Sequence, residues 1–179
     1  MQHEGFERIT REDYLGDLTS RPLEEVRAMR AECQAVEADL SYLRRLVQGR
    51  LDIVAGEARR REAGEPRADG RTLVASLAEA LSERGGGGAG RGALPQGLGP
   101  SSDDGRLTEE LDRICDGSRL AALDDLDDAA LATLVRDLGA LERDVSAQRS
   151  LTFQRLDALS AEITRRYRTG EASVENLLP

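Results

Sequence analysis

The stretch VRAMRAECQAVEADLSYLRRLV, residues 26–47, repeats apolar side chains at alternating steps of three and four residues. The apolar seam consists of Val26, Met29, Cys33, Val36, Leu40, Leu43 and Val47. Such steps, sustained over three heptads, are typical of a coiled-coil helix. We therefore expect a long helix that buries this seam against a second helix. It should run from the Ser20/Pro22 start signal to about Ala63, where Gly64 and Pro66 stop it.

A second long helix is expected from near Asp125 to about Arg168, with Gly170 closing it. Its seam contains Leu131, Leu134, Leu138, Leu141, Val145, Leu156, Leu159 and Ile163, and it weakens at Gln148 and Thr152. Two long helices joined by a long connection can pack antiparallel. The sequence thus predicts an all-α fold, with two long helices in an intramolecular antiparallel coiled coil.

The remaining segments predict short accessory helices and a flexible linker. Thr10, followed by Glu12 and Asp13, indicates a short helix that Gly16 ends. TLVASLAEALSER (72–84) and LTEELDRIC (107–115) each predict a short helix, and the Gly/Pro-rich residues 85–105 predict a flexible linker. The expected organisation is an N-terminal segment (1–20), a long helix (21–63), a linker with short helices (64–124), a long helix (125–169) and a tail (170–179).

Composition excludes several classes of function. The chain has 179 residues, 3% aromatic content and a formal net charge of −9, which argues against coating DNA or an anionic membrane. No apolar run is long enough to span a bilayer, and the polar N-terminus is unlike a secretory signal. Two cysteines and one histidine form no disulfide framework or metal motif. We expect a reduced, cytoplasmic protein without a metal.

The two long helices contain a repeat. Residues 36–61 align with 141–166 at an offset of 105 without a gap, and eleven of the 26 positions are identical. A polar stripe is repeated, one position after the seam: Glu37, Ser41, Arg44, Gln48 and Asp52 in the first copy; Glu142, Ser146, Arg149, Phe153 and Asp157 in the second. Each stripe lies about 100° round the helix from the buried edge. Antiparallel copies would be related by a pseudo-two-fold axis, which suits a two-fold symmetric ligand.

The plain alternative is a solvated flank held together by salt bridges. Within the stripe, however, no acid faces a base at a helical spacing. If the copies are centred on each other, Arg44 should approach Arg149 and Asp52 should approach Glu142, which is unfavourable without a ligand. The arginine runs 59–61 and 165–166 favour the C-terminal ends of helices and need no further role.

The stripe has the chemistry to bind guanine and phosphate. An Arg guanidinium can donate two hydrogen bonds to guanine O6 and N7, and an Asp carboxylate can accept from N1–H and the exocyclic amine. Ser and Gln can bind phosphate or ribose oxygens. We therefore interpret the stripe as a nucleotide-binding surface.

The spacing Glu37-x3-Ser41-x2-Arg44-x3-Gln48-x3-Asp52 resembles the signature of RsiG-type anti-sigma factors of actinobacteria. The second copy matches at Glu142, Ser146, Arg149 and Asp157, and Phe153 stands where Gln is expected. The resemblance implies a two-helix coiled coil that binds a dimer of cyclic di-GMP and sequesters a WhiG-type sporulation sigma factor from RNA polymerase. For Phe153, stacking on a base and a surface or packing role both remain open.

Two other functions compete with this interpretation. A ligand-independent coiled-coil adaptor would use the same helices and ignore the nucleotide. An enzyme is disfavoured, because the sequence has no Gly-rich phosphate loop after a strand and no nucleophile–His pair. The acidic residues 101–116 and DDLDDAALATLVRD (124–137) are compatible with the basic, DNA-facing surfaces of a sigma factor, and equally with helix N-terminal acids and a solvated linker.

Overall fold

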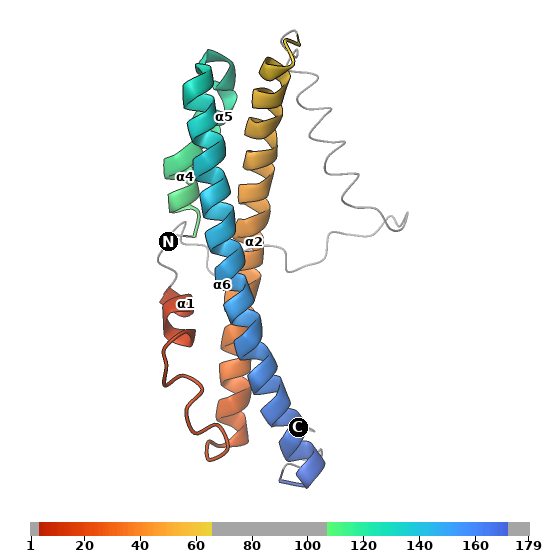
Figure 1. Cartoon of the computed structure of the whole chain (residues 1–179). Helices are drawn as coiled ribbons and strands as arrows, with labels where there is room; N and C mark the ends of the chain where they lie inside the picture. Colours follow the sequence, from red (N-terminus) through yellow and green to blue (C-terminus); the bar gives the residue numbers. More distant parts are fainter. Residues whose placement is uncertain (1–3, 66–106, 172–179) are drawn as a thin grey trace, which may run out of the picture. The chain divides into compact units, whose positions relative to one another are not determined.

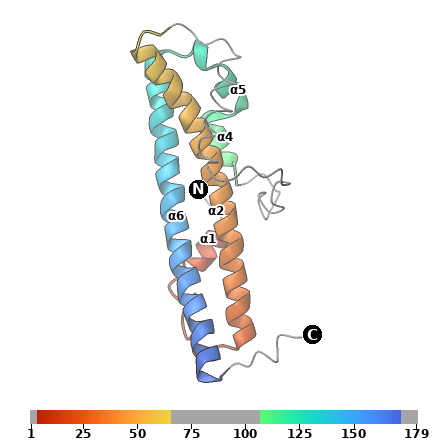
Figure 2. The same cartoon turned by 90° about the vertical axis from the view of Figure 1, so that its right-hand side faces the viewer.

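The computed structural model describes residues 4–65 and 107–171, and every regular element among them is helical (Figures 1 and 2). The elements are α1 (Glu4–Ile9), α2 (Leu23–Glu62), α4 (Glu109–Cys115), α5 (Gly117–Ala121), the 3-10 helix η1 (Leu123–Asp125) and α6 (Asp128–Thr169). The predicted all-α class is confirmed. The helix expected at 72–84 and the linker expected at 85–105 lie outside the described residues.

The described residues form two compact units, and both long helices pass through both units. The first unit holds residues 4–45, 107–110 and 142–171, and the second holds 46–65 and 111–141. Contacts in the first unit show that α2 and α6 run antiparallel. Arg30 Nε donates to Ser160 Oγ at 3.1 Å, whereas Arg44, further along α2, reaches back to Glu142 on α6.

The predicted seam is the core between the long helices. All seven seam residues of α2 are buried, from Val26 to Val47. On α6 the buried seam residues are Leu131, Leu134, Leu138, Leu141, Val145 and Leu159. Gln148 and Thr152, where the apolar pattern weakens, are also buried. The seam therefore continues on α6 through two polar side chains.

The long helices end on glycines, as the sequence indicated. Gly64 has φ 67° and Gly170 has φ 76°, a left-handed conformation that glycine adopts without steric cost. The α6 helix begins at Asp128, three residues after the expected start near Asp125. Asp127 provides the reason: its Oδ1 accepts a hydrogen bond from the backbone N–H of Ala130 at 2.7 Å and so caps the helix.

The N-terminal helix lies before Thr10, so the helix expected from Thr10 to Gly16 is wrong. The Thr10 hydroxyl donates back to the carbonyl oxygen of Phe6 at 2.8 Å, at the C-terminal end of α1, instead of capping a following helix. Asp17, with φ 53°, lies in the turns that follow. The pattern Thr–Glu–Asp was locally compatible with a helix start, but Ile9, fully buried, anchors the chain earlier.

Each unit has an accessory segment that contacts α2. Tyr14 Oη donates to the Met29 carbonyl at 3.1 Å and to Glu32 Oε2 at 3.0 Å. In the second unit, Arg50 Nη1 donates to Asp112 Oδ1 of α4 at 2.7 Å. In the first unit, Glu32 lies roughly 120° around α2 from Arg44. The N-terminal segment thus contacts a face of α2 different from that of Arg44.

Candidate functional site

The first unit contains most of the predicted site residues. They are Glu37, Ser41 and Arg44 on α2, with Glu142, Ser146, Arg149, Phe153 and Asp157 on α6. The two remaining residues, Gln48 and Asp52, follow on α2 in the second unit. Phe153, Asp52 and Asp157 are exposed, and the other seven are partly buried. The stripe is therefore accessible along both helices.

Arg44 crosses from α2 to the second copy of the motif on α6. Its Nε donates to Glu142 Oε1 at 3.0 Å and to Ser146 Oγ at 2.7 Å. The Ser146 hydroxyl in turn donates to Glu142 Oε1 at 3.0 Å. The carboxylate thus accepts bonds from a cation and a hydroxyl, and the Ser146 oxygen helps to orient the guanidinium.

Arg149 makes the equivalent contacts in the opposite direction. Its Nε donates to Glu37 Oε1 at 2.9 Å and to Ser41 Oγ at 2.6 Å. The Ser41 hydroxyl donates to Glu37 Oε1 at 2.6 Å. Each hydrogen bond around Arg44 has an equivalent around Arg149, made by the residues 105 positions away in the sequence. The six residues therefore form a pseudo-two-fold arginine cluster, defined here as Glu37, Ser41, Arg44, Glu142, Ser146 and Arg149.

The arginine cluster shows how the charges of the two copies are balanced. We expect like charges to gather where the copies are centred on each other unless something neutralises them, and the structure pairs the arginine of each copy with the glutamate of the other. The sequence could not show this, because an interhelical pair depends on the register between residues about 100 positions apart. Interhelical ion pairs of this kind are what the salt-bridge alternative predicts.

The arginine cluster retains capacity for a ligand. The Arg44 side chain is 35% exposed and the Arg149 side chain is 32% exposed. A guanidinium has five N–H donors, and the bonds described above use only Nε. The glutamates hold both guanidinium groups in fixed orientations and partly neutralise them. Two oriented, partly exposed arginines about a pseudo-two-fold axis can bind a symmetric anion or two guanine edges.

Phe153 makes the two copies unequal. The ring is 40% exposed, and the Arg149 guanidinium carbon lies 4.9 Å from its centroid, a cation–π geometry. Phe153 is one helical turn beyond Arg149, so the ring can restrain that guanidinium. In the first copy the same position is Gln48. Phe153 therefore has a packing role on Arg149 and also presents an apolar surface to solvent.

Sequence reasoning missed a second set of repeated residues, at the C-terminal ends of the long helices. Glu57, Arg60 and Arg61 correspond to Glu162, Arg165 and Arg166 at the same offset of 105. From the sequence alone, the position of these arginines at helix ends indicates no further role. The signal that could have revealed them was the identity of Glu57 and Glu162, which are both buried acids in the structure.

Within the described ranges, no group of three or more His, Cys, Asp or Glu residues could hold a metal ion. None of the helices in these ranges combines the length and apolar character that crossing a membrane requires. Cys33 and Cys115 are buried free thiols, and burial raises the pKa of both. Neither cysteine lies in the polar stripe.

Comparison with known proteins identifies a family. A family model described as RsiG-like matches residues 12–81 and 117–179, which include both long helices and both copies of the motif. No curated protein matches the chain.

Proposed function

Because the chain belongs to the RsiG-like family, we propose that it is an anti-sigma factor controlled by cyclic di-GMP. In this proposal the polar stripe binds the nucleotide, and the protein sequesters a WhiG-type sporulation sigma factor from RNA polymerase in the cytoplasm. The proposal assigns no enzymatic reaction to the chain. The observation that carries it is the arginine cluster, in which both copies of the motif present an oriented arginine on the same pair of helices.

The geometry supports guanine as the recognised group. Each guanidinium can offer a pair of donors to the O6 and N7 edge of a guanine. The exposed carboxylates of Asp52 and Asp157 are suited to accept from N1–H and the exocyclic amine. Cyclic di-GMP carries two guanines related by a two-fold axis, and a dimer of such molecules would fit a pseudo-symmetric stripe with repeated arginines.

Charge supports a basic protein partner. The net charge is −9, and exposed acids at Asp125, Asp127 and Asp128 precede or open α6. Sigma factors bind DNA through basic surfaces, so an acidic surface of this chain can compete for them. We propose these acids as part of the sigma-binding surface.

A ligand-independent coiled-coil adaptor is the second candidate, and one observation favours it. The ion pairs Arg44–Glu142 and Arg149–Glu37 balance the arginine and glutamate charges of the stripe without any nucleotide. Such an adaptor would bind its partner equally well with and without cyclic di-GMP.

The deciding experiment is calorimetric titration of the purified chain with cyclic di-GMP, with GTP and cyclic di-AMP as controls. Selective binding of more than one nucleotide per chain supports the proposal. The titration is then repeated with a WhiG-type sigma factor present, because the partner can complete a ligand site. Absence of a heat signal in both titrations, together with nucleotide-independent sigma binding, would favour the adaptor.

A further inference from the structure

A second repeated motif, Glu-x2-Arg-Arg, lies near the C-terminal end of each long helix, with one copy in each unit. Its copies are Glu57, Arg60 and Arg61 in the second unit, and Glu162, Arg165 and Arg166 in the first. Both glutamates are only 8% exposed. Arg61 Nε and Arg166 Nε each donate to Oε1 of their own glutamate at 2.7 Å.

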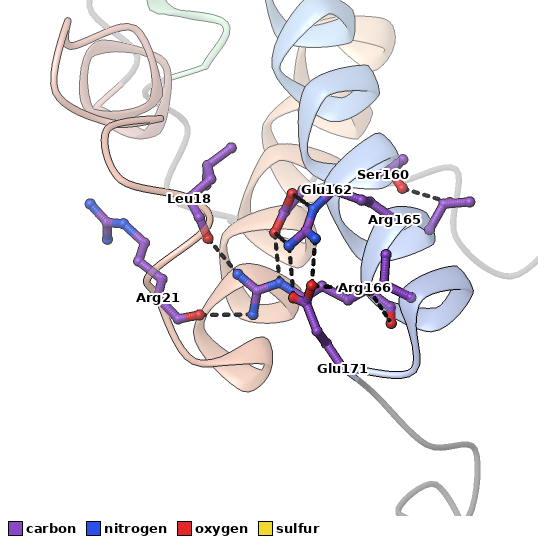
Figure 3. Close-up of polar contacts among 9 residues, drawn as sticks. Leu18, Arg21, Ser160, Glu162, Arg165, Arg166 and Glu171 are labelled. Carbon is purple, nitrogen blue, oxygen red and sulfur yellow. Dashed lines mark hydrogen bonds and ion pairs between the residues drawn. The ribbon is translucent and has the colours of Figure 1, made fainter.

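Each motif also donates hydrogen bonds to backbone carbonyls in the segment that leads into the other long helix. Arg166 Nη1 donates to the Arg21 carbonyl at 2.8 Å, and Nη2 donates to the Leu18 carbonyl (Figure 3). These carbonyls lie two and five residues before Leu23, the first residue of α2. The guanidinium thus bridges Glu162 on α6 to the backbone that leads into α2.

The other copy makes the same contacts at the same positions. Arg61 Nη1 donates to the Leu126 carbonyl at 2.6 Å, and Nη2 donates to the Leu123 carbonyl at 2.8 Å. These carbonyls lie two and five residues before Asp128, the first residue of α6. Matching donors and matching acceptors at both ends show that the repeat includes the loops as well as the helices. Helix-end electrostatics alone would not require a shared set of carbonyl acceptors.

The carboxylates hold the arginines in position. Hydrogen bonds from Arg165 and then Arg166 lower the pKa of Glu162 to about 2. Bonds from Arg60 and Arg61 lower the pKa of Glu57 in the same way. An ionised carboxylate this poorly hydrated is stable only while its cationic partners stay in place. Each motif therefore behaves as one unit, with the glutamate orienting an arginine whose other nitrogens bind the backbone.

The apolar seam alone leaves the register between the helices underdetermined. A heptad seam buries similar side chains after a slip of seven residues, which displaces one helix by about 10 Å. A slip would move Arg61 and Arg166 away from the carbonyl oxygens that they bind in the loop before the other helix. The slipped helix would not bring equivalent carbonyls to the same place. We propose that the two Glu-x2-Arg-Arg motifs are register latches, whose residues position the arginine cluster by selecting one antiparallel alignment.

Spin-label distances test this proposal without any nucleotide, so the result is independent of the proposed function. Labels are attached to cysteines placed at the exposed positions Gln34 and Ser150, both in the first unit, while the buried Cys33 and Cys115 stay unreacted. The parent should give one narrow distance population. Combining Glu57→Gln, Arg61→Lys, Glu162→Gln and Arg166→Lys should add a second, separate distance population, which corresponds to an axial slip of about 10 Å. Lys cannot reproduce the fork of donors that Arg provides.

The matched control is Glu171→Gln, which removes the exposed partner of Arg165 and leaves Glu162 intact. It should retain one population. If the fourfold variant melts at a lower temperature but keeps the parental distance, the motifs stabilise the helices without selecting their register, and the proposal fails. If that variant does not fold, Arg166→Lys alone decides: a broadened or split distribution supports the proposal, and the parental distribution overturns it.

Discussion

The two copies of the stripe motif make matching hydrogen bonds, but the side chains around them differ. Arg44 and Arg149 each reach a glutamate and a serine of the other copy, at distances that agree within 0.1 Å. One stripe position has diverged, from Gln48 to Phe153. The polar contacts between the copies are therefore the same, although a neighbouring side chain differs.

The seam behind the two copies differs as well. Leu43 and Val47 of the first copy correspond to Gln148 and Thr152 of the second, and all four are buried. Gln148 Nε2 donates to Asp144 Oδ2 at 3.0 Å, but its Oε1 is buried without a hydrogen-bond partner in the described part of the chain. The second copy thus has the more polar core. The contacts of the arginine cluster are therefore the same in both copies, although the core packing behind them differs.

Removing the polar contacts of the first copy should have the largest effect. Arg44→Ala and Asp52→Ala should each weaken cyclic di-GMP binding by about ten- to a hundredfold or more, because each removes charge-assisted hydrogen bonds. Calorimetric titration measures the affinity, and circular dichroism should show nearly unchanged helix content. Arg149→Ala tests whether the second copy contributes equally. Loss of folding without a specific loss of affinity would make the stripe structural.

Lowering the pH should remove the stabilising contributions of Glu57 and Glu162 to different extents. Their pKa values are lowered in the folded state, so their stabilising contribution is present above the ordinary value of 4.5 and is lost as pH falls. For Glu162 the loss should extend down to about pH 2. Urea unfolding between pH 5 and pH 2 measures it. Glu162→Gln should flatten this pH dependence more than Glu57→Gln, and equal slopes for parent and Glu162→Gln would contradict the assignment.

Replacing Gln148 by the residue of the other copy should stabilise the protein. Gln148→Leu removes a buried acceptor without a partner and restores the side chain found at Leu43. We expect the free energy of unfolding to rise by about 1–2 kcal/mol, measured by urea denaturation. Thr152→Val is the matched control, because the Thr152 hydroxyl already donates to the Gln148 carbonyl at 2.9 Å. A fall in stability for Gln148→Leu would show that the amide oxygen is needed.

Phe153→Gln, which makes the stripes alike, should have the smallest effect. Removing a cation–π contact at a partly exposed ring costs about 0.5–1 kcal/mol at most, and Gln restores the side chain of the first copy. Affinity for cyclic di-GMP should therefore stay the same or increase in a calorimetric titration. A severe loss would instead assign Phe153 a stacking role on a base. The reciprocal Gln48→Phe variant shows whether the first copy tolerates the ring.

Much of the fold could be predicted because it depends on local periodicity. The seam from Val26 to Val47 follows from steps of three and four, and the glycines at 64 and 170 end helices for reasons of backbone conformation. The N-terminal helix could not be placed in this way. Thr10 is compatible with either end of a helix, and the burial of Ile9 depends on packing that only the folded chain provides.

The sequence by itself determined two long helices, their buried faces, the repeat at an offset of 105 and the residues of the polar stripe. These properties depend on spacing along one chain segment, which the helical period converts directly into faces. Only the tertiary structure decided the register: the pairing of Arg44 with Glu142 and of Arg149 with Glu37, and the hydrogen bonds of Arg61 and Arg166 to loop carbonyls. A heptad seam by itself tolerates a slip of seven residues, so polar contacts between distant residues help to select the alignment.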